Sequence, residues 1–167
     1  SSFTGNTATA TGAAGLTHAG GGAVFIDTIS STQSAASIVA LAASADSVTL
    51  FRGNSVTIND VTTANSIAFG RSFGDRSESD AILNVTPDAG GVIDLYDPIS
   101  VDIDNGHSFA MDVSGQGMLN WGGDNRLDVA RTDAASNLVK LTAGRVALQS
   151  DFTLRSTTNN LAVELAG

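Results

Sequence analysis

The stretch Gly90 to Ile99 reads G-G-V-I-D-L-Y-D-P-I, and its pattern recurs along the whole chain. Two glycines open it, and Asp97-Pro98 near its end is typical of a turn. The β-favouring residues between and beyond these signals are Val92, Ile93, Leu95, Tyr96 and Ile99. The stretch therefore predicts one short strand between two turns.

The same order, a turn of small residues followed by about five β-formers, indicates a repeating β unit. Strong predicted strands begin near Val24, Val48, Ile67, Val92, Met118, and Leu138 or Val146. The intervals are tolerable in a solenoid, whose turns absorb insertions while the strands keep stacking. The intervals are too long for a sandwich, whose hairpins follow one another more closely. A sandwich would also need several hairpin turns, and Asn105-Gly106 is the one dipeptide of the Asn-Gly type. We therefore expect an all-β solenoid of about six or seven coils, forming a single domain over residues 1–167.

Two Phe-x-Gly-Asn elements, at 3–6 and 51–54, lie 48 residues apart. Gly-Asn suits a corner with a positive φ angle, and Phe suits an inward strand position. Because solenoid coils have periods of about 20 to 50 residues, the interval is interpreted as two coils of about 24 residues each.

Short strands are expected throughout the chain, at 7–9, 23–26, 37–41, 48–51, 55–57, 56–61, 67–69, 82–85, 92–96, 100–104, 107–113, 118–121, 126–131, 138–141, 146–148, 152–154 and 161–165. The segment 37–41 also fits a single helical turn, but its central Ile38-Val39 pair favours a strand. Segment 70–80 has no apolar period and predicts a protruding loop. In segment 100–104, Val101 and Ile103 are expected to point inward, and Asp102 and Asp104 to face water.

Composition limits the possible functions. Hydrophobic residues make up 42% of the chain but aromatic residues only 5%, so we expect small side chains in the core. The formal net charge is −9, and the basic residues are scattered singly, which argues against a nucleic-acid partner. Nine acidic residues lie between Asp75 and Asp112, with Arg76 as the one basic residue. A solvated surface and a cation site both fit this acidic region.

Cysteine is absent, which excludes a disulfide framework and thiolate metal sites. The longest apolar stretch, Ala35 to Ala43, is too short to span a membrane. The sequence opens at Ser1 without a signal peptide, and we interpret it as an excised or processed piece.

The one dense group of ligating residue types consists of Asp94, Asp97, Asp102, Asp104, His107 and Asp112. Asp102 and Asp104 share a strand face, so a catalytic pair and a loose calcium site are alternatives to an ordinary solvated strand. An EF-hand is excluded, because aligning Gly106 with its invariant glycine puts Val101 at the first ligand position.

Other signals of chemistry are weak. His18 and His107 form no recognisable nucleophilic triad, and no G-x-S-x-G motif occurs. Tyr96 and Trp121 are expected to pack in the core or at corners rather than to stack on a sugar. We therefore assign no catalytic, cofactor-binding or metal-binding residue, expect no cofactor, and predict that the chain is not an enzyme.

Several motifs resemble those of one family, the autotransporter passengers of the pertactin-like and polymorphic outer-membrane protein repeat type. The Phe-x-Gly-Asn elements match F-x-x-N, and 21–24 matches G-G-A-[ILV]. Segment 92–99 is similar to I-x-F-Y-D-P-I, with Leu95 in place of Phe. Segment 115–125 resembles G-x-G-T-V-x-F-S-G-x-N, and 137–148 resembles the passenger-associated repeat T-x-V-x-x-G-T-L-x-L. The apparent insertion between Gly22 and Phe51 and the charged loop at 71–80 depart from the family pattern.

The resemblance implies a right-handed parallel β-helix near the C-terminal end of a longer passenger. It also implies type V secretion, with the passenger at the cell surface of a Gram-negative bacterium or secreted, and a C-terminal outer-membrane barrel as a partner outside this sequence. We expect adhesion or bacterial aggregation, with a host-cell surface or matrix component, or the same protein on a neighbouring cell, as partner. A structural stalk that supports secretion is the alternative, and a carbohydrate-active β-helix enzyme is a third.

Overall fold

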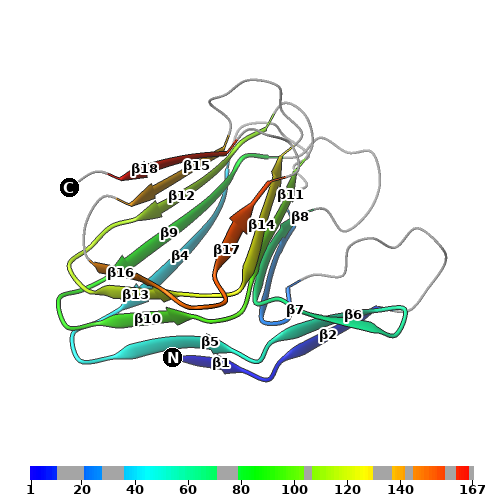
Figure 1. Ribbon diagram of the computed structural model, residues 1–167, viewed down its shortest axis with the longest axis horizontal. Coiled ribbons are helices and arrows are strands. Elements are labelled where there is room, and N and C mark those ends of the chain that lie inside the picture. The colour runs from blue at the N-terminus through cyan, green and yellow to red at the C-terminus, as the bar shows by residue number, and fades with distance from the viewer. Residues whose placement is uncertain are drawn as a thin grey trace.

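The computed structural model describes residues 1–10, 21–27, 36–70, 79–103, 107–129, 137–141, 145–156 and 161–165. These residues form strands joined by turns and bends, with no helix among them (Figure 1). The strands make three five-stranded sheets and one three-stranded sheet. Every pairing within the five-stranded sheets is parallel. The predicted all-β class is therefore confirmed, with parallel sheets.

We name the sheets by their strands, in spatial order. Sheet I contains β1 (Ser2–Thr4), β5 (Val48–Arg52), β10 (Val92–Leu95), β13 (Met118–Trp121) and β16 (Arg145–Leu148). Sheet II contains β3 (Val24–Asp27), β8 (Ile67–Gly70), β11 (Ile99–Ile103), β14 (Asp124–Val129) and β17 (Thr153–Arg155). Sheet III contains β4 (Ser37–Ala43), β9 (Ala81–Pro87), β12 (Phe109–Val113), β15 (Asn137–Leu141) and β18 (Leu161–Leu165). The hairpin sheet contains β2 (Thr7–Ala10), β6 (Ser55–Ile58) and β7 (Val61–Ala64).

The chain visits sheets I, II and III in the same order each time, and we call one such passage a circuit. Each strand of a circuit pairs with the corresponding strand of the next circuit. The first circuit also contains β2, and the second also contains β6 and β7. Segment 37–41 lies within β4, so the predicted strand is confirmed there.

The register corrects the predicted coil length. Phe3 pairs directly with Phe51, although 48 residues separate these neighbouring elements. The interval is therefore one circuit rather than two, and each large sheet has five strands in the described residues rather than six or seven. The strands β3 and β4, which lie between Gly22 and Phe51, are ordinary members of sheets II and III and so do not belong to an insertion.

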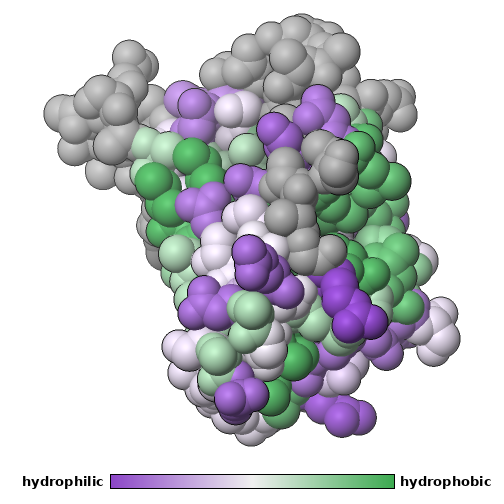
Figure 2. Space-filling model, turned by 90° about the vertical axis from the view of Figure 1, so that its left-hand side faces the viewer, coloured by the Kyte–Doolittle hydropathy of each residue, from purple (hydrophilic) through white to green (hydrophobic). Residues whose placement is uncertain are grey.

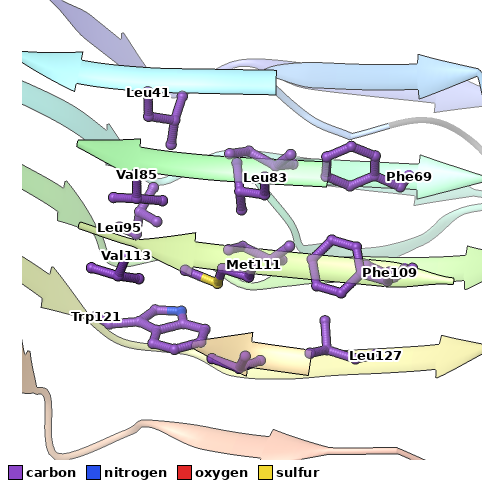
Figure 3. Close-up of a cluster of buried hydrophobic side chains, with 14 of the residues drawn as sticks. Leu41, Phe69, Leu83, Val85, Leu95, Phe109, Met111, Val113, Trp121 and Leu127 are labelled. Carbon is purple, nitrogen blue, oxygen red and sulfur yellow. The ribbon is translucent and has the colours of Figure 1, made fainter. Parts of the chain in front are cut away.

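The core lies between the three large sheets, because alternate residues of each strand point inward. Leu41, Val85 and Val113 occupy successive strands of sheet III and lie one above another (Figure 3). Phe51, Leu95 and Trp121 form a similar column in sheet I. The predicted inward orientation of Val101 and Ile103 and the outward orientation of Asp102 are confirmed. Asp104 lies outside the described residues.

A buried polar cluster fills the corner where sheet I leads into sheet II. Asp97 accepts hydrogen bonds from the backbone N–H groups of Gly53 and Asn54, at 2.9 and 2.7 Å, and from the side chains of Asn54 and Ser66. In the next circuit, Asn125 Oδ1 accepts from the Ile99 N–H at 2.9 Å. Asp97 therefore satisfies corner backbone groups and does not belong to the solvated acidic surface that its sequence neighbourhood indicated.

The left-hand side of the molecule in Figure 1 carries turns between sheets III and I. Viewed from that side, two groups of hydrophobic residues are separated by a band of largely hydrophilic ones (Figure 2). This side of the molecule is therefore neither uniformly polar nor uniformly apolar.

Candidate ligand-binding groove

A β-hairpin interrupts the second circuit and borders the candidate site. Strands β6 and β7 pair antiparallel, with Ile58 opposite Val61. The two residues between them, Asn59 and Asp60, have φ angles of 47° and 66°. Two successive positive φ angles are the requirement of a type I′ hairpin turn, and Asn and Asp tolerate them better than most residues.

The hairpin corrects a second expectation, because 56–61 was predicted as one strand. The sequence signal for this turn was Asn59-Asp60, since both residues favour turns and the pair lies between two runs of β-formers. It was missed because Asn-Gly and Asp-Gly are the stronger hairpin dipeptides. The Asn105-Gly106 pair, identified instead, lies outside the described residues.

An open groove of about 950 Å³ lies on the outer face of sheet II beside this hairpin. Its apolar end is formed by Phe25, Val56, Ile58 and Ala68. Its charged end is formed by Asp102, Asp124, Arg126, Asp128 and Arg155. Residues from all five strands of sheet II line it, so the groove crosses the strands rather than following one of them.

The register of the strands in sheet II determines which residues form the floor of the groove. Phe25 pairs with Ala68, Ala68 with Ser100, Ser100 with Arg126, and Arg126 with Arg155. These five residues therefore form one outward column, with one member on each strand. Asp102 and Asp128 form the adjacent outward column on β11 and β14. The inward neighbours of the floor, such as Ile99 and Leu127, are buried in the core.

Ion pairs organise the charged end of the groove. Arg155 donates from Nε and one terminal nitrogen to the two carboxylate oxygens of Asp124, at 2.8 and 2.7 Å, and Thr153 donates to the same carboxylate at 2.6 Å. Hydrogen bonds from Arg155 and then Thr153 lower the pKa of Asp124 below its ordinary value. Arg126 donates through Nε to Asp128 on the same strand. The two arginines are thereby held in place, with about half of each side chain exposed.

Asn65 occupies the middle of the groove. Its Nδ2 donates to the Ser100 hydroxyl at 2.7 Å, while its buried Oδ1 has no hydrogen-bond partner in the described part of the chain. Buried polar atoms in proteins are rarely left without a partner unless water or a ligand supplies one. The centre of the groove therefore has an unmet requirement for a hydrogen-bond donor.

The structure separates most of the acidic residues that the sequence grouped. Asp94 lies on sheet I and accepts from Asn120 at 2.6 Å, Asp97 is buried at a corner, and Asp112 lies on sheet III. Among the described members of that group, Asp102 alone lines the groove, where it is paired in register with Asp128. The described residues contain no group of three or more His, Cys, Asp or Glu residues able to hold a metal ion.

The histidine and aromatic candidates lie apart from the groove. His107 Nδ1 is 3.6 Å from the Asp80 carboxylate, and His18 lies outside the described residues. Trp121 is buried and donates to Asn125 Oδ1 at 3.1 Å, which confirms its predicted packing role. Tyr96 is half-buried beneath the guanidinium of Arg52. Residues 71–78 of the predicted protruding loop also lie outside the described residues.

Within the described residues, no helix is long and apolar enough to cross a membrane. Comparisons with known protein families, curated proteins and solved structures gave no match. Inferences about function therefore start from the groove and the sheets that hold it.

Proposed function

We propose that sheets I, II and III are the three faces of a right-handed parallel β-helix, and that the chain is a segment of an autotransporter passenger near its C-terminal end. The repeated order of the sheets and the residue-by-residue parallel register support this reading. The family resemblance of the Phe-x-Gly-Asn elements adds support, since their phenylalanines stack with ring centroids 4.7 Å apart. The passenger would be secreted to the surface of a Gram-negative cell and remain linked to an outer-membrane barrel.

Its proposed role is adhesion or cell-to-cell aggregation through the face that carries the groove. The observation that carries this proposal is the hairpin of β6 and β7, which departs from the repeated circuit and borders a groove. A stacked scaffold needs no such hairpin, and binding surfaces commonly occur where loops depart from a rigid framework. The partner would be a host-cell surface or matrix component, or the same protein on a neighbouring cell.

A structural stalk is the second candidate. It is favoured by the continuous core, in which Leu83, Met111 and Val139 lie on three successive strands and are fully buried. Because of such a column, each circuit is stabilised by its contacts with the circuits on either side. In this reading the circuits support secretion, and the binding sites lie elsewhere in the passenger.

A carbohydrate-active enzyme is the third candidate, and the charged end of the groove argues against it. A glycosidase needs one carboxylic acid whose pKa is raised, so that it donates a proton near neutral pH. The pKa of Asp124 is instead lowered, and Asp128 is paired with Arg126. Two of the three carboxylates at the charged end are thus held in ion pairs with arginine, and we propose a binding role without catalysis.

Surface display tests the adhesion proposal. Residues 1–167 would be fused to a display barrel in a non-adherent bacterium, with the empty barrel as control. Settling of the culture or attachment to cultured cells or matrix proteins would support adhesion. If the chain is folded and exposed but neither effect occurs, adhesion is wrong and the stalk is favoured.

A further inference from the structure

We propose that the groove on sheet II binds a neutral, linear oligosaccharide. This inference rests on the proposed binding function and names the ligand class for the same site. The groove crosses five strands spaced about 4.8 Å apart, so its floor from Phe25 to Arg155 is about 19 Å long. A floor of that length and an open form fit a chain-like ligand.

The charges favour a neutral ligand over an anionic one. The charged end contains three carboxylates and two guanidinium groups, and both guanidinium groups already have carboxylate partners. An anionic polymer is attracted by clustered cations in excess, which this groove lacks, and the chain as a whole carries −9. Sulfated glycans and nucleic acids are therefore poor candidates for this site.

The same ion pairs provide fixed hydrogen-bonding groups. A guanidinium has five N–H donors, and Nε and one terminal nitrogen of Arg155 are committed to Asp124. The side chains of Arg126 and Arg155 are 53% and 54% exposed, so donors face the groove beside carboxylate acceptors. The vicinal hydroxyl groups of a sugar both donate and accept hydrogen bonds. They therefore match the alternating guanidinium donors and carboxylate acceptors of the groove, which together carry little net charge.

The remaining lining fits other parts of a sugar. Asn65 Oδ1 lacks a donor, and the Ser100 hydroxyl lies beside it on the floor, so the middle of the groove is polar but uncharged. Phe25 is 36% exposed at the apolar end, where an aromatic ring can cover the C–H face of a pyranose. A polar centre with an aromatic end is expected of a site that holds a ring with hydroxyl edges and an apolar face.

A peptide ligand fits less well. The floor is the outer face of a sheet, where backbone groups pair within the sheet and offer nothing to an extended peptide. Strand addition requires an exposed sheet edge. The edges beside the groove are β7 of the hairpin sheet and the end strands β3 and β17 of sheet II, so a strand added there would lie along one border of the groove and not across its floor.

Calorimetric titration of residues 1–167 tests the proposal. The probes are cellohexaose, mannohexaose, xylohexaose and galactohexaose, with a heparin hexasaccharide and an unstructured octapeptide for comparison. We expect saturable binding of at least one neutral hexasaccharide and none of the heparin fragment. Absence of binding by all four neutral probes, or tighter binding of heparin or peptide, would overturn the proposal.

Substitutions locate the site. Arg126→Lys keeps a cation beside Asp128 and therefore the fold, but it removes the planar donor fork, so binding is expected to weaken by about tenfold. Phe25→Ala should weaken binding by a similar factor. Their matched controls, Arg145→Lys and Val48→Ala, change exposed residues of sheet I and should alter binding less than about twofold. Equal effects of a groove variant and its control would place the ligand elsewhere and overturn the proposal.

The display assay separates this inference from the proposed function. Displayed cells that attach through a protein in the absence of glycan binding would support adhesion and overturn the ligand class. Hexasaccharide binding without attachment or settling would support the groove as a glycan site and contradict adhesion.

Discussion

The first two circuits and the last three use the same sheets but differ in length. Corresponding residues lie 48 residues apart between the first two circuits and 44 apart between Gly53 and Asp97. Asp94 and Asn120, in the third and fourth circuits, are only 26 residues apart. The N-terminal circuits therefore hold extra chain, including the hairpin, while the C-terminal circuits form the regular repeat. The pairing of the described strands stays in register, so the extra residues lie between strands and not within them.

The largest expected effect comes from breaking the regular part. Ile93 is fully buried at the centre of sheet I, and Ile93→Asp would place an unpaired charge there. We expect a loss of more than about 4 kcal/mol in the free energy of unfolding, measured by thermal and urea denaturation. Val92→Asp, on the outward side of the same strand, should cost less than about 1.5 kcal/mol. Similar losses for both variants would contradict the inward assignment.

A somewhat smaller effect is expected at the corner where the long and short circuits meet. Asp97→Ala removes the acceptor for the N–H groups of Gly53 and Asn54, and the Asn54 N–H is left buried without it. The free energy of unfolding should fall by about 3 kcal/mol in urea denaturation. Asp94→Asn, on the same segment but half-buried, should cost less than about 1 kcal/mol. An Asp97→Ala protein as stable as Asp94→Asn would show that the corner does not depend on this carboxylate.

The hairpin turn offers a gain in stability in the irregular part. Asp60 has a φ angle of 66°, which glycine adopts without steric cost. Asp60→Gly should raise the free energy of unfolding by about 0.5 kcal/mol, while Asp60→Val should lower it by about 1 kcal/mol. Urea denaturation of the two variants beside the parent chain measures both changes. If Asp60→Val raised the free energy of unfolding, a type I′ turn at Asn59-Asp60 would be contradicted.

The smallest effect concerns the pH dependence at the charged end of the groove. The pKa of Asp124 is lower in the folded protein than its ordinary value, so its ion pair stabilises the fold above the unfolded-state pKa. That contribution is lost as the pH falls through the lowered folded-state pKa. Asp124→Asn should therefore slightly reduce stability at neutral pH and slightly flatten the loss below pH 4. Thermal melts between pH 2 and 7 measure the difference, with the exposed Asp151→Asn as control. Identical pH profiles for the parent chain and Asp124→Asn would contradict this role.

Strand positions were largely predictable from the sequence. The runs around Val24, Ile93 and Met111 are β-favouring and bounded by turns, and each lies in a strand. The Gly-Asn corners were also predictable, since Gly5 and Gly53 have φ angles of 65° and 71°. These features depend on residues close together in the chain, so local preferences are enough to identify them.

The candidate site was far less predictable. Asp102 was selected for its neighbour Asp104, but the groove combines it with Asp128, Arg126 and Arg155 from other circuits. Phe25 and Asn65 carried no signal of their own. The role of Asp97 was not predictable either, because an aspartate before proline is typical of an exposed turn. Its buried role follows only from the N–H groups of Gly53 and Asn54, which donate to it from the preceding circuit.

By itself, the amino-acid sequence determined that the chain forms short strands whose side chains alternate between two faces, since that alternation has a period of two residues. Only the tertiary structure decided which strands are neighbours, because parallel pairing joins residues 24 to 48 positions apart and permits any interval whose loop can close. The groove depends on those pairings, since each strand of sheet II contributes a single member of the floor column.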